Sequence, residues 1–174
     1  QELNVTFDGK PVVSLAISPE YSKDGLVFAG VNGSGIFRSV DQGETWEAVN
    51  DGLFALSIAN IAFSPAFSKD NMLFAGVDDG GIFRSDNKGS SWSGMNAGLP
   101  GAYYREIALS PDFGSDQTVF SGFTDIHVSS NAGLNWTPLG SLTWNSYITS
   151  LVVSPDGKFV YAGTYGESLF CLQR

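Results

Sequence analysis

The chain has 174 residues, of which 43% are hydrophobic, 13% aromatic and only 16% charged, and its 21 glycines favour short strands and tight turns over long helices. A net charge of −9 argues against a nucleic-acid partner, because phosphate backbones bind to basic surfaces. A single cysteine, Cys171, excludes an internal disulfide, and no apolar run approaches the ~18 residues of a membrane-spanning helix.

Four similar units follow one another along the chain. Their Ser-Pro pairs end at Pro19, Pro65, Pro111 and Pro155, with spacings of 46, 46 and 44 residues, which indicates a repeat architecture. Each unit predicts an alternating strand before the Ser-Pro pair, a second strand ending in glycine, a third short strand and an outer fourth strand. In chain order, the predicted strands cover 12–19, 26–30, 35–39 and 45–50; 59–65, 72–76, 81–85 and 91–96; 105–111, 118–122, 125–130 and 135–140; and 149–155, 159–163 and 168–172.

Four antiparallel strands in about 45 residues are typical of a β-propeller blade. We therefore predict one all-β domain over 1–174, a β-propeller of four four-stranded blades, with repeats at 11–50, 57–96, 103–140 and 147–174. The fourth unit lacks its outer strand, and residues 2–7 resemble the end of one, so we expect the N-terminal strand to close the ring. Two alternatives stay open: two chains form an eight-bladed ring, or the N-terminal strand is donated to a neighbouring chain.

A box of eight residues closes the third strand of three units, as SVDQGETW at 39–46, SDNKGSSW at 85–92 and SSNAGLNW at 129–136. The first copy resembles the Asp-box of the BNR-repeat propellers, which include sialidases, glycoside hydrolases that process oligoxyloglucan, the sortilin ectodomain and photosystem II assembly factors. In that superfamily the boxes are structural and lie away from the active face. The residues that we expect to act as turn-stabilising staples are Ser39, Asp41, Gly43, Trp46, Ser85, Asn87, Gly89, Trp92, Ser129, Asn131, Gly133 and Trp136.

Repeated acidic residues also follow the first strand of three units, at Asp24, Asp70 and Asp116. Their place in register favours turn capping. Each loop offers too few oxygen ligands for a dedicated calcium cage, so no cofactor or metal is implied.

The sequence predicts no catalytic residue. His127 aligns with Phe37 and Phe83, which indicates a packing position, and Cys171 has no acid-base partner nearby in the sequence. The arginine motif that the sialidases carry near their N-terminus is missing. A pair of carboxylates among Asp78, Asp79, Asp125 and Glu167 remains the basis of an alternative, a glycoside hydrolase or a fragment of one.

One face of the propeller, where the connections between blades and the loops between second and third strands meet, is the predicted binding surface. Aromatic rings beside Asp and Asn suit sugars, and equally suit protein partners. We predict a non-catalytic, secreted or cell-surface binding or assembly module with a protein or glycan partner; a filament subunit built by strand donation is a further alternative. The candidate ligand-binding residues are Phe54, Tyr103, Tyr104, Trp144, Tyr147, Asp78, Asp79, Asp125 and Tyr165.

Overall fold

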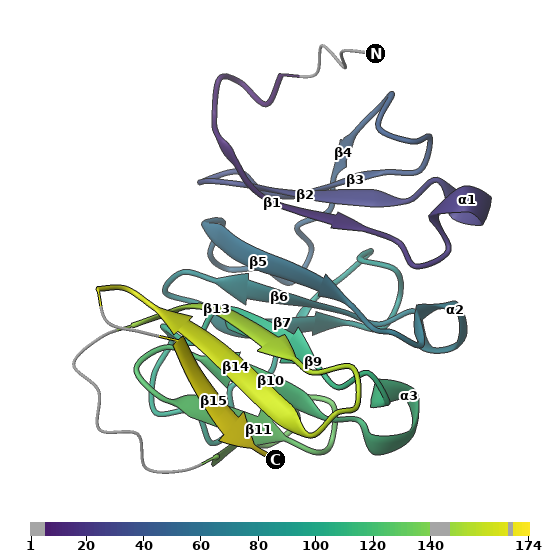
Figure 1. The fold of residues 1–174 in the computed structure, drawn as a ribbon. Helices are drawn as coiled ribbons and strands as arrows, with labels where there is room; N and C mark the ends of the chain where they lie inside the picture. The colour runs from purple at the N-terminus through teal and green to yellow at the C-terminus, as the bar shows by residue number, and fades with distance from the viewer. Residues whose placement is uncertain (1–5, 140–146, 167–168) are drawn as a thin grey trace.

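The computed structural model describes residues 6–139, 147–166 and 169–174, and these form an all-β, propeller-type arrangement of antiparallel sheets (Figure 1). We call the sheets blades 1 to 4. Blade 1 contains β1 (Val12–Ile17), β2 (Val27–Val31), β3 (Gly35–Ser39) and β4 (Glu47–Ala48), and blade 2 contains β5 (Ile58–Phe63), β6 (Leu73–Val77), β7 (Gly81–Ser85) and β8 (Ser93–Gly94). Blade 3 contains β9 (Glu106–Leu109), β10 (Val119–Gly122), β11 (Ile126–Ser129) and β12 (Thr137–Pro138), and blade 4 contains β13 (Ile148–Val153), β14 (Phe159–Thr164) and β15 (Leu169–Gln173).

Within each blade every strand pairs with the next along the chain, as the repeat predicted. The sequence did not predict the single helical turns α1 (Tyr21–Asp24), α2 (Phe67–Asp70) and α3 (Phe113–Asp116), which join the first and second strands of blades 1 to 3. The last residue of each turn caps it. The carboxylate of Asp70, for example, accepts hydrogen bonds from Ser64 Oγ at 2.6 Å and Met72 N at 2.9 Å, and Asp24 and Asp116 make the same pair of bonds.

The blades stack in series along their first strands. The contacts run from β1 to β5, from β5 to β9 and from β9 to β13, and each junction encloses its own apolar cluster. A phenylalanine of each second strand, Phe28, Phe74 or Phe120, fills the junction with the following blade and is completely buried. The core is therefore a row of repeated blade-to-blade layers.

Over the described residues the four blades form an open arc. Blades 1 and 4 lie at opposite ends of it (Figure 1), because the packing runs only from each blade to its neighbour along the chain. Of residues 2–7, predicted to supply the closing strand, residues 2–5 lie outside the described residues. Phe7, the last of the predicted segment, packs on blade 1, with ring centroids 4.8 Å from Phe37 and 5.6 Å from Trp46.

Hydrogen bonds within each box hold its turn. In the first, Ser39 Oγ accepts a bond from Gly43 N at 2.8 Å, and Asp41 accepts bonds from Thr45 N and Thr45 Oγ1 at 2.9 and 2.5 Å. These bonds hold the pKa of Asp41 down at about 2. The serine of the second box and that of the third make the equivalent bonds to Gly89 and Gly133, and asparagine replaces the aspartate in both.

Two of the boxes also join neighbouring blades. The indole Nε1 of Trp92 donates to Val49 O of blade 1 at 2.9 Å, and that of Trp136 donates to Met95 O of blade 2 at 2.7 Å. Both rings are buried. The Nε1 of Trp46, in blade 1, donates instead to Gly43 O in its own box at 2.9 Å.

Candidate functional site on blades 3 and 4

A row of four aromatic rings lies on blades 3 and 4, in the loops at the end of the strands opposite to α1, α2 and α3. The centroid of Phe123 is 5.4 Å from that of Tyr103 and 6.0 Å from that of Tyr147. Tyr147 is in turn 5.9 Å from Tyr165. The planes of Phe123 and Tyr147 differ by only 7°, and those of Tyr147 and Tyr165 by 29°. We call these four residues the aromatic row.

The propeller repeat places these rings side by side. Tyr103 and Tyr147 precede the first strands of blades 3 and 4, while Phe123 and Tyr165 directly follow the second strands. Two backbone bonds fix the register, from Ile148 N to Phe123 O at 2.6 Å and from Tyr165 N to Tyr147 O at 2.9 Å. The three tyrosines of the row are exposed, so the row faces solvent over much of its length.

A shallow hollow of about 200 Å³ opens at one end of the row. The hollow is lined by the rings of two residues of the row, by backbone and by a hydroxyl group. This composition suits the apolar face and the hydroxyls of a sugar. The lining residues are Pro100, Gly101, Tyr103, Tyr104, Phe123 and Thr124.

Tyr104, Asp125 and His127 form a polar cluster beneath the hollow. The hydroxyl of Tyr104 donates to the carboxylate of Asp125, and His127 Nδ1 lies 3.6 Å from the same carboxylate. Burial, together with the Asp125 carboxylate, raises the pKa of Tyr104, so its hydroxyl remains a donor at neutral pH. Burial lowers the pKa of His127, whose ring lies edge-on to Tyr104, so the imidazole is neutral at pH 7. His127 thus occupies the packing position expected from the repeat.

Two charged residues, Arg105 and Asp78, lie at the neighbouring junction of blades 2 and 3 and form an ion pair. The adjacent Glu106 lies on the other side of β9 from Ile107, the side that faces blade 4. Burial, reinforced by Asp78 and opposed by Arg105, raises the pKa of Glu106 to about 7. Sequence reasoning missed Glu106; the available signal was its alignment with Ser14, Asn60 and Ser150, where it is the only charged side chain.

The structure brings together five of the nine predicted ligand-binding residues, namely Tyr103, Tyr104, Tyr147, Tyr165 and Asp125. Asp78 lies one junction away in its ion pair, and Asp79 is exposed in the turn between β6 and β7. Phe54 packs on Phe83 between blades 1 and 2, with centroids 5.1 Å apart, and is not part of the row. Trp144 lies outside the described residues.

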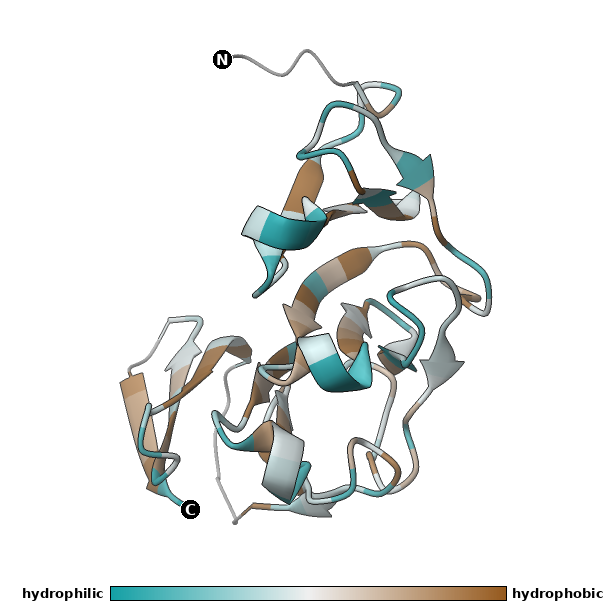
Figure 2. Ribbon diagram, turned by 90° about the vertical axis from the view of Figure 1, so that its right-hand side faces the viewer, coloured by the Kyte–Doolittle hydropathy of each residue, from teal (hydrophilic) through white to brown (hydrophobic). Residues whose placement is uncertain are grey.

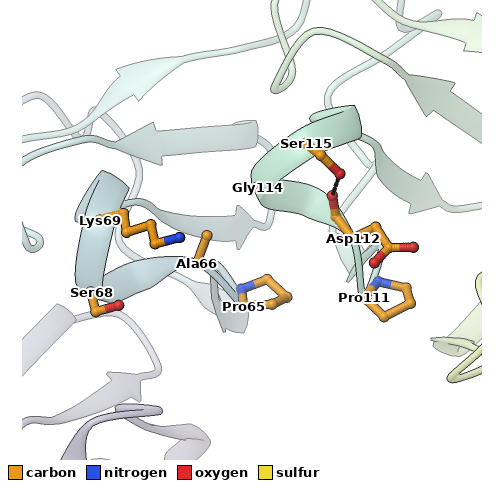
Figure 3. A pocket seen from close by; sticks show the side chains of 8 residues that line it. All are labelled: Pro65, Ala66, Ser68, Lys69, Pro111, Asp112, Gly114 and Ser115. Carbon is orange, nitrogen blue, oxygen red and sulfur yellow. Dashed lines mark hydrogen bonds between the residues drawn. The ribbon is translucent and has the colours of Figure 1, made fainter.

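A second concavity lies between α2 and α3, at the opposite end of the strands (Figure 3). It has a volume of about 300 Å³ and is lined by Pro65, Ala66, Ser68, Lys69, Pro111, Asp112, Gly114 and Ser115. Its walls are the two repeated Ser-Pro turns, and the bond from Ser115 Oγ to Asp112 O is internal to one of them. It has no aromatic ring and one side chain of each charge, so we regard it as a gap between two blades. Among the described residues no cluster of three or more His, Cys, Asp or Glu could hold a metal ion.

No protein-family model matches the sequence, and a comparison with curated proteins finds no match. The structure is similar to a GH74 xyloglucanase from Xanthomonas campestris, with a TM-score of 0.70 and 18% identity over 94% of this chain. It is also similar to the extracellular domain of BT4673 from B. thetaiotaomicron (TM-score 0.74, 16% identity, all of this chain) and to the computationally designed Ika4 protein (0.65, 20%, 99%). The chain spans 28% of the xyloglucanase and 22% of the BT4673 domain, but 98% of Ika4.

None of the helices formed by the described residues is long or apolar enough to cross a membrane. At these identities the structural likenesses establish the fold alone. The chain has a β-propeller-type fold, built from four repeated blades.

Proposed function

We propose that this chain is a non-catalytic binding module that holds a glycan across the aromatic row, at an extracellular or cell-surface location. The observation that carries the proposal is the row itself: four neighbouring rings, three of them exposed tyrosines, on one face of blades 3 and 4. Exposed aromatic rings in register offer flat apolar surfaces to successive sugar units. The extracellular domain and the GH74 xyloglucanase among the structural neighbours support the choice of location and of first ligands.

Polar groups beside the row would orient a bound glycan. Asp125 accepts from Tyr104, and the ion pair of Arg105 and Asp78 lies at the next junction. A binding site typically combines such a mainly apolar surface with a few polar groups of fixed position. The row therefore has the composition of a glycan site without requiring a reaction.

A glycoside hydrolase is the second candidate, and one observation favours it. A pKa of about 7 makes Glu106 able to hold a proton at neutral pH, as a general acid must. Of the four carboxylates predicted as members of a pair, Asp78 is engaged by Arg105 and Asp125 by Tyr104, whereas Asp79 is exposed in a turn. Glu167 lies outside the described residues. A non-catalytic role therefore fits the geometry better.

The test is calorimetric titration of the chain with a panel of oligosaccharides, beginning with xyloglucan fragments. Tyr147→Ala removes the central ring of the row, and we expect it to weaken binding at least about tenfold, or 1.4 kcal/mol. Phe54→Ala is the matched control, because Phe54 is another exposed ring on a blade connection and lies outside the row.

Three results would overturn the proposal. The first is that no glycan binds, and the second is that Phe54→Ala weakens binding as much as Tyr147→Ala. The third is the release of new reducing ends from a bound glycan, lost in Glu106→Gln, which would establish the hydrolase.

A further inference from the structure

The three junctions within the chain repeat one pattern of apolar contacts. The second and third strands of each blade turn two large side chains towards the following blade, Phe28 and Ile36, Phe74 and Ile82, or Phe120 and Ile126, and all six are 0% exposed. The first strand of the following blade covers them with Ile61, Ile107 or Leu151.

Blade 4 presents the same pattern to solvent. Val160 and Ala162 of β14 pack on blade 3, so by alternation Tyr161 points the other way, in the position of Phe28. On β13 and β15 the outward residues include Val152, 59% exposed, and Leu169, 70% exposed. We call Val152, Tyr161 and Leu169 the trailing face. Figure 2 shows apolar strand segments in this last sheet, beside the C-terminus.

Blade 1 presents the opposite half of the pattern. Leu15 aligns with Ile61 and Ile107, which are 6% and 5% exposed, yet Leu15 itself is 66% exposed. Ile17, two residues along the same strand, is 61% exposed. We call Leu15 and Ile17 the leading face. Both end faces, as defined by these residues, are free of charged side chains.

The box tryptophans also differ between blade 1 and the later blades. Trp92 and Trp136 reach backbone carbonyls of the preceding blade, whereas Trp46 bonds within its own box. Likewise Arg38 and Arg84 reach carbonyls of the following box, at Lys88 and Ala132, whereas the residue in their position on blade 4 is the exposed Cys171. Blades 1 and 4 thus present complementary halves of the junction that forms three times between neighbouring blades.

We propose that a second copy of this chain completes the junction, the leading face of each copy packing on the trailing face of the other. The two faces lie at opposite ends of one arc (Figure 1), so a second arc engages both at once and closes a two-fold symmetric ring of eight blades. The argument for this occupant is continuity: the contact would repeat an interface already present three times in the chain. The proposal is independent of glycan binding.

The experiment is light scattering after size exclusion, over a wide range of chain concentration. We expect a mass of twice 18.5 kDa, with no larger species. Leu15→Glu on the leading face and Val152→Lys on the trailing face should each yield the 18.5 kDa monomer, because each places a charge in both junctions. Both positions are exposed in the single chain, so unchanged circular dichroism should confirm that the variants fold.

Mixing the two variants identifies which faces meet. In a mixed pair, one junction brings the introduced carboxylate of Leu15→Glu against the introduced ammonium of Val152→Lys, and the other junction is native, so the dimer should re-form. Leu134→Glu is the matched control, because Leu134 is an exposed leucine in the third box, at the position that Glu44 occupies in the first. This variant should remain dimeric.

A second readout needs no variant. The thiol of Cys171 lies beside Leu169 on the outward side of β15 and should react more slowly with a thiol reagent as the chain concentration rises. A wild-type monomer at all concentrations, a series of masses that keeps growing, or a mixture that stays monomeric would each overturn the proposal.

Discussion

Trp92 and Trp46 occupy the same position in two boxes and have different partners. The indole of Trp92 is buried and donates across the junction to Val49 O, whereas that of Trp46 donates to Gly43 O in its own box. Trp92→Phe leaves a buried carbonyl unpaired and should lower the free energy of unfolding by about 1–2 kcal/mol in urea denaturation. Trp46→Phe should cost clearly less, and equal losses would contradict a role of Trp92 in joining blades.

Glu106 should make stability depend on pH. Its folded-state pKa of about 7 lies above the ordinary 4.5, so the folded chain binds the proton more tightly than the unfolded chain. Stability contributed by the protonated form is complete below pH 4.5 and is lost as the pH rises through 7. Allowing for the partial exposure of Glu106, we expect the free energy of unfolding of Glu106→Gln to exceed that of wild type by about 1–2 kcal/mol at pH 8. Near pH 4 the two free energies of unfolding should be equal.

Thermal and urea unfolding from about pH 4 to about pH 8 would check this prediction. Asp112→Asn, on the exposed turn between β9 and α3, is the control for removing a carboxylate. If the free energies of unfolding of wild type and Glu106→Gln change with pH in parallel, the carboxyl of Glu106 is solvated and the prediction is wrong.

Single residues were predictable where the repeat assigns them a fixed local role. Asp24, Asp70, Asp116 and the boxes bond within a few residues of themselves, so their spacing alone indicated turn capping. Glu106 and Arg105 could not be assigned in this way, because burial and a partner in another blade determine their chemistry.

At the scale of the elements, a close backbone approach joins blades 2 and 3. A Cβ added to Gly76 at the end of β6 would lie 1.8 Å from Arg105 O, a backbone atom that cannot turn aside. Gly76→Ala should therefore destabilise the fold by about 3 kcal/mol, measured by urea denaturation. Gly101→Ala, whose Cβ would meet nothing within 4 Å, should be close to neutral, and similar losses for both would contradict the close approach.

The strands were predictable because alternation and the 46-residue period specify them together. The helical turns α1, α2 and α3 were not, since four residues such as Phe67–Asp70 are too few to show a helical pattern. The sequence alone also does not show whether one chain closes the ring. Leu15 and Val152 read as ordinary core positions of their strands, and only the arrangement of the blades shows that neither is covered by another blade within the described chain.

At the scale of the whole molecule, the open arc separates two surfaces with different tasks. The end faces are apolar and would be covered by the other copy in the proposed ring, whereas the aromatic row lies at one end of the strands. A ring of two chains would thus carry two aromatic rows. The net charge of −9 on each chain would favour solubility of such an assembly.

The most direct test of the central claim, that the aromatic row binds a glycan, is a nitrogen-15 NMR spectrum of the chain recorded before and after adding the tightest-binding oligosaccharide. The account predicts that the largest shift changes fall on the backbone amides of Tyr103, Phe123, Tyr147 and Tyr165. Changes confined to the groove between α2 and α3, or spread evenly over the four blades, would contradict it.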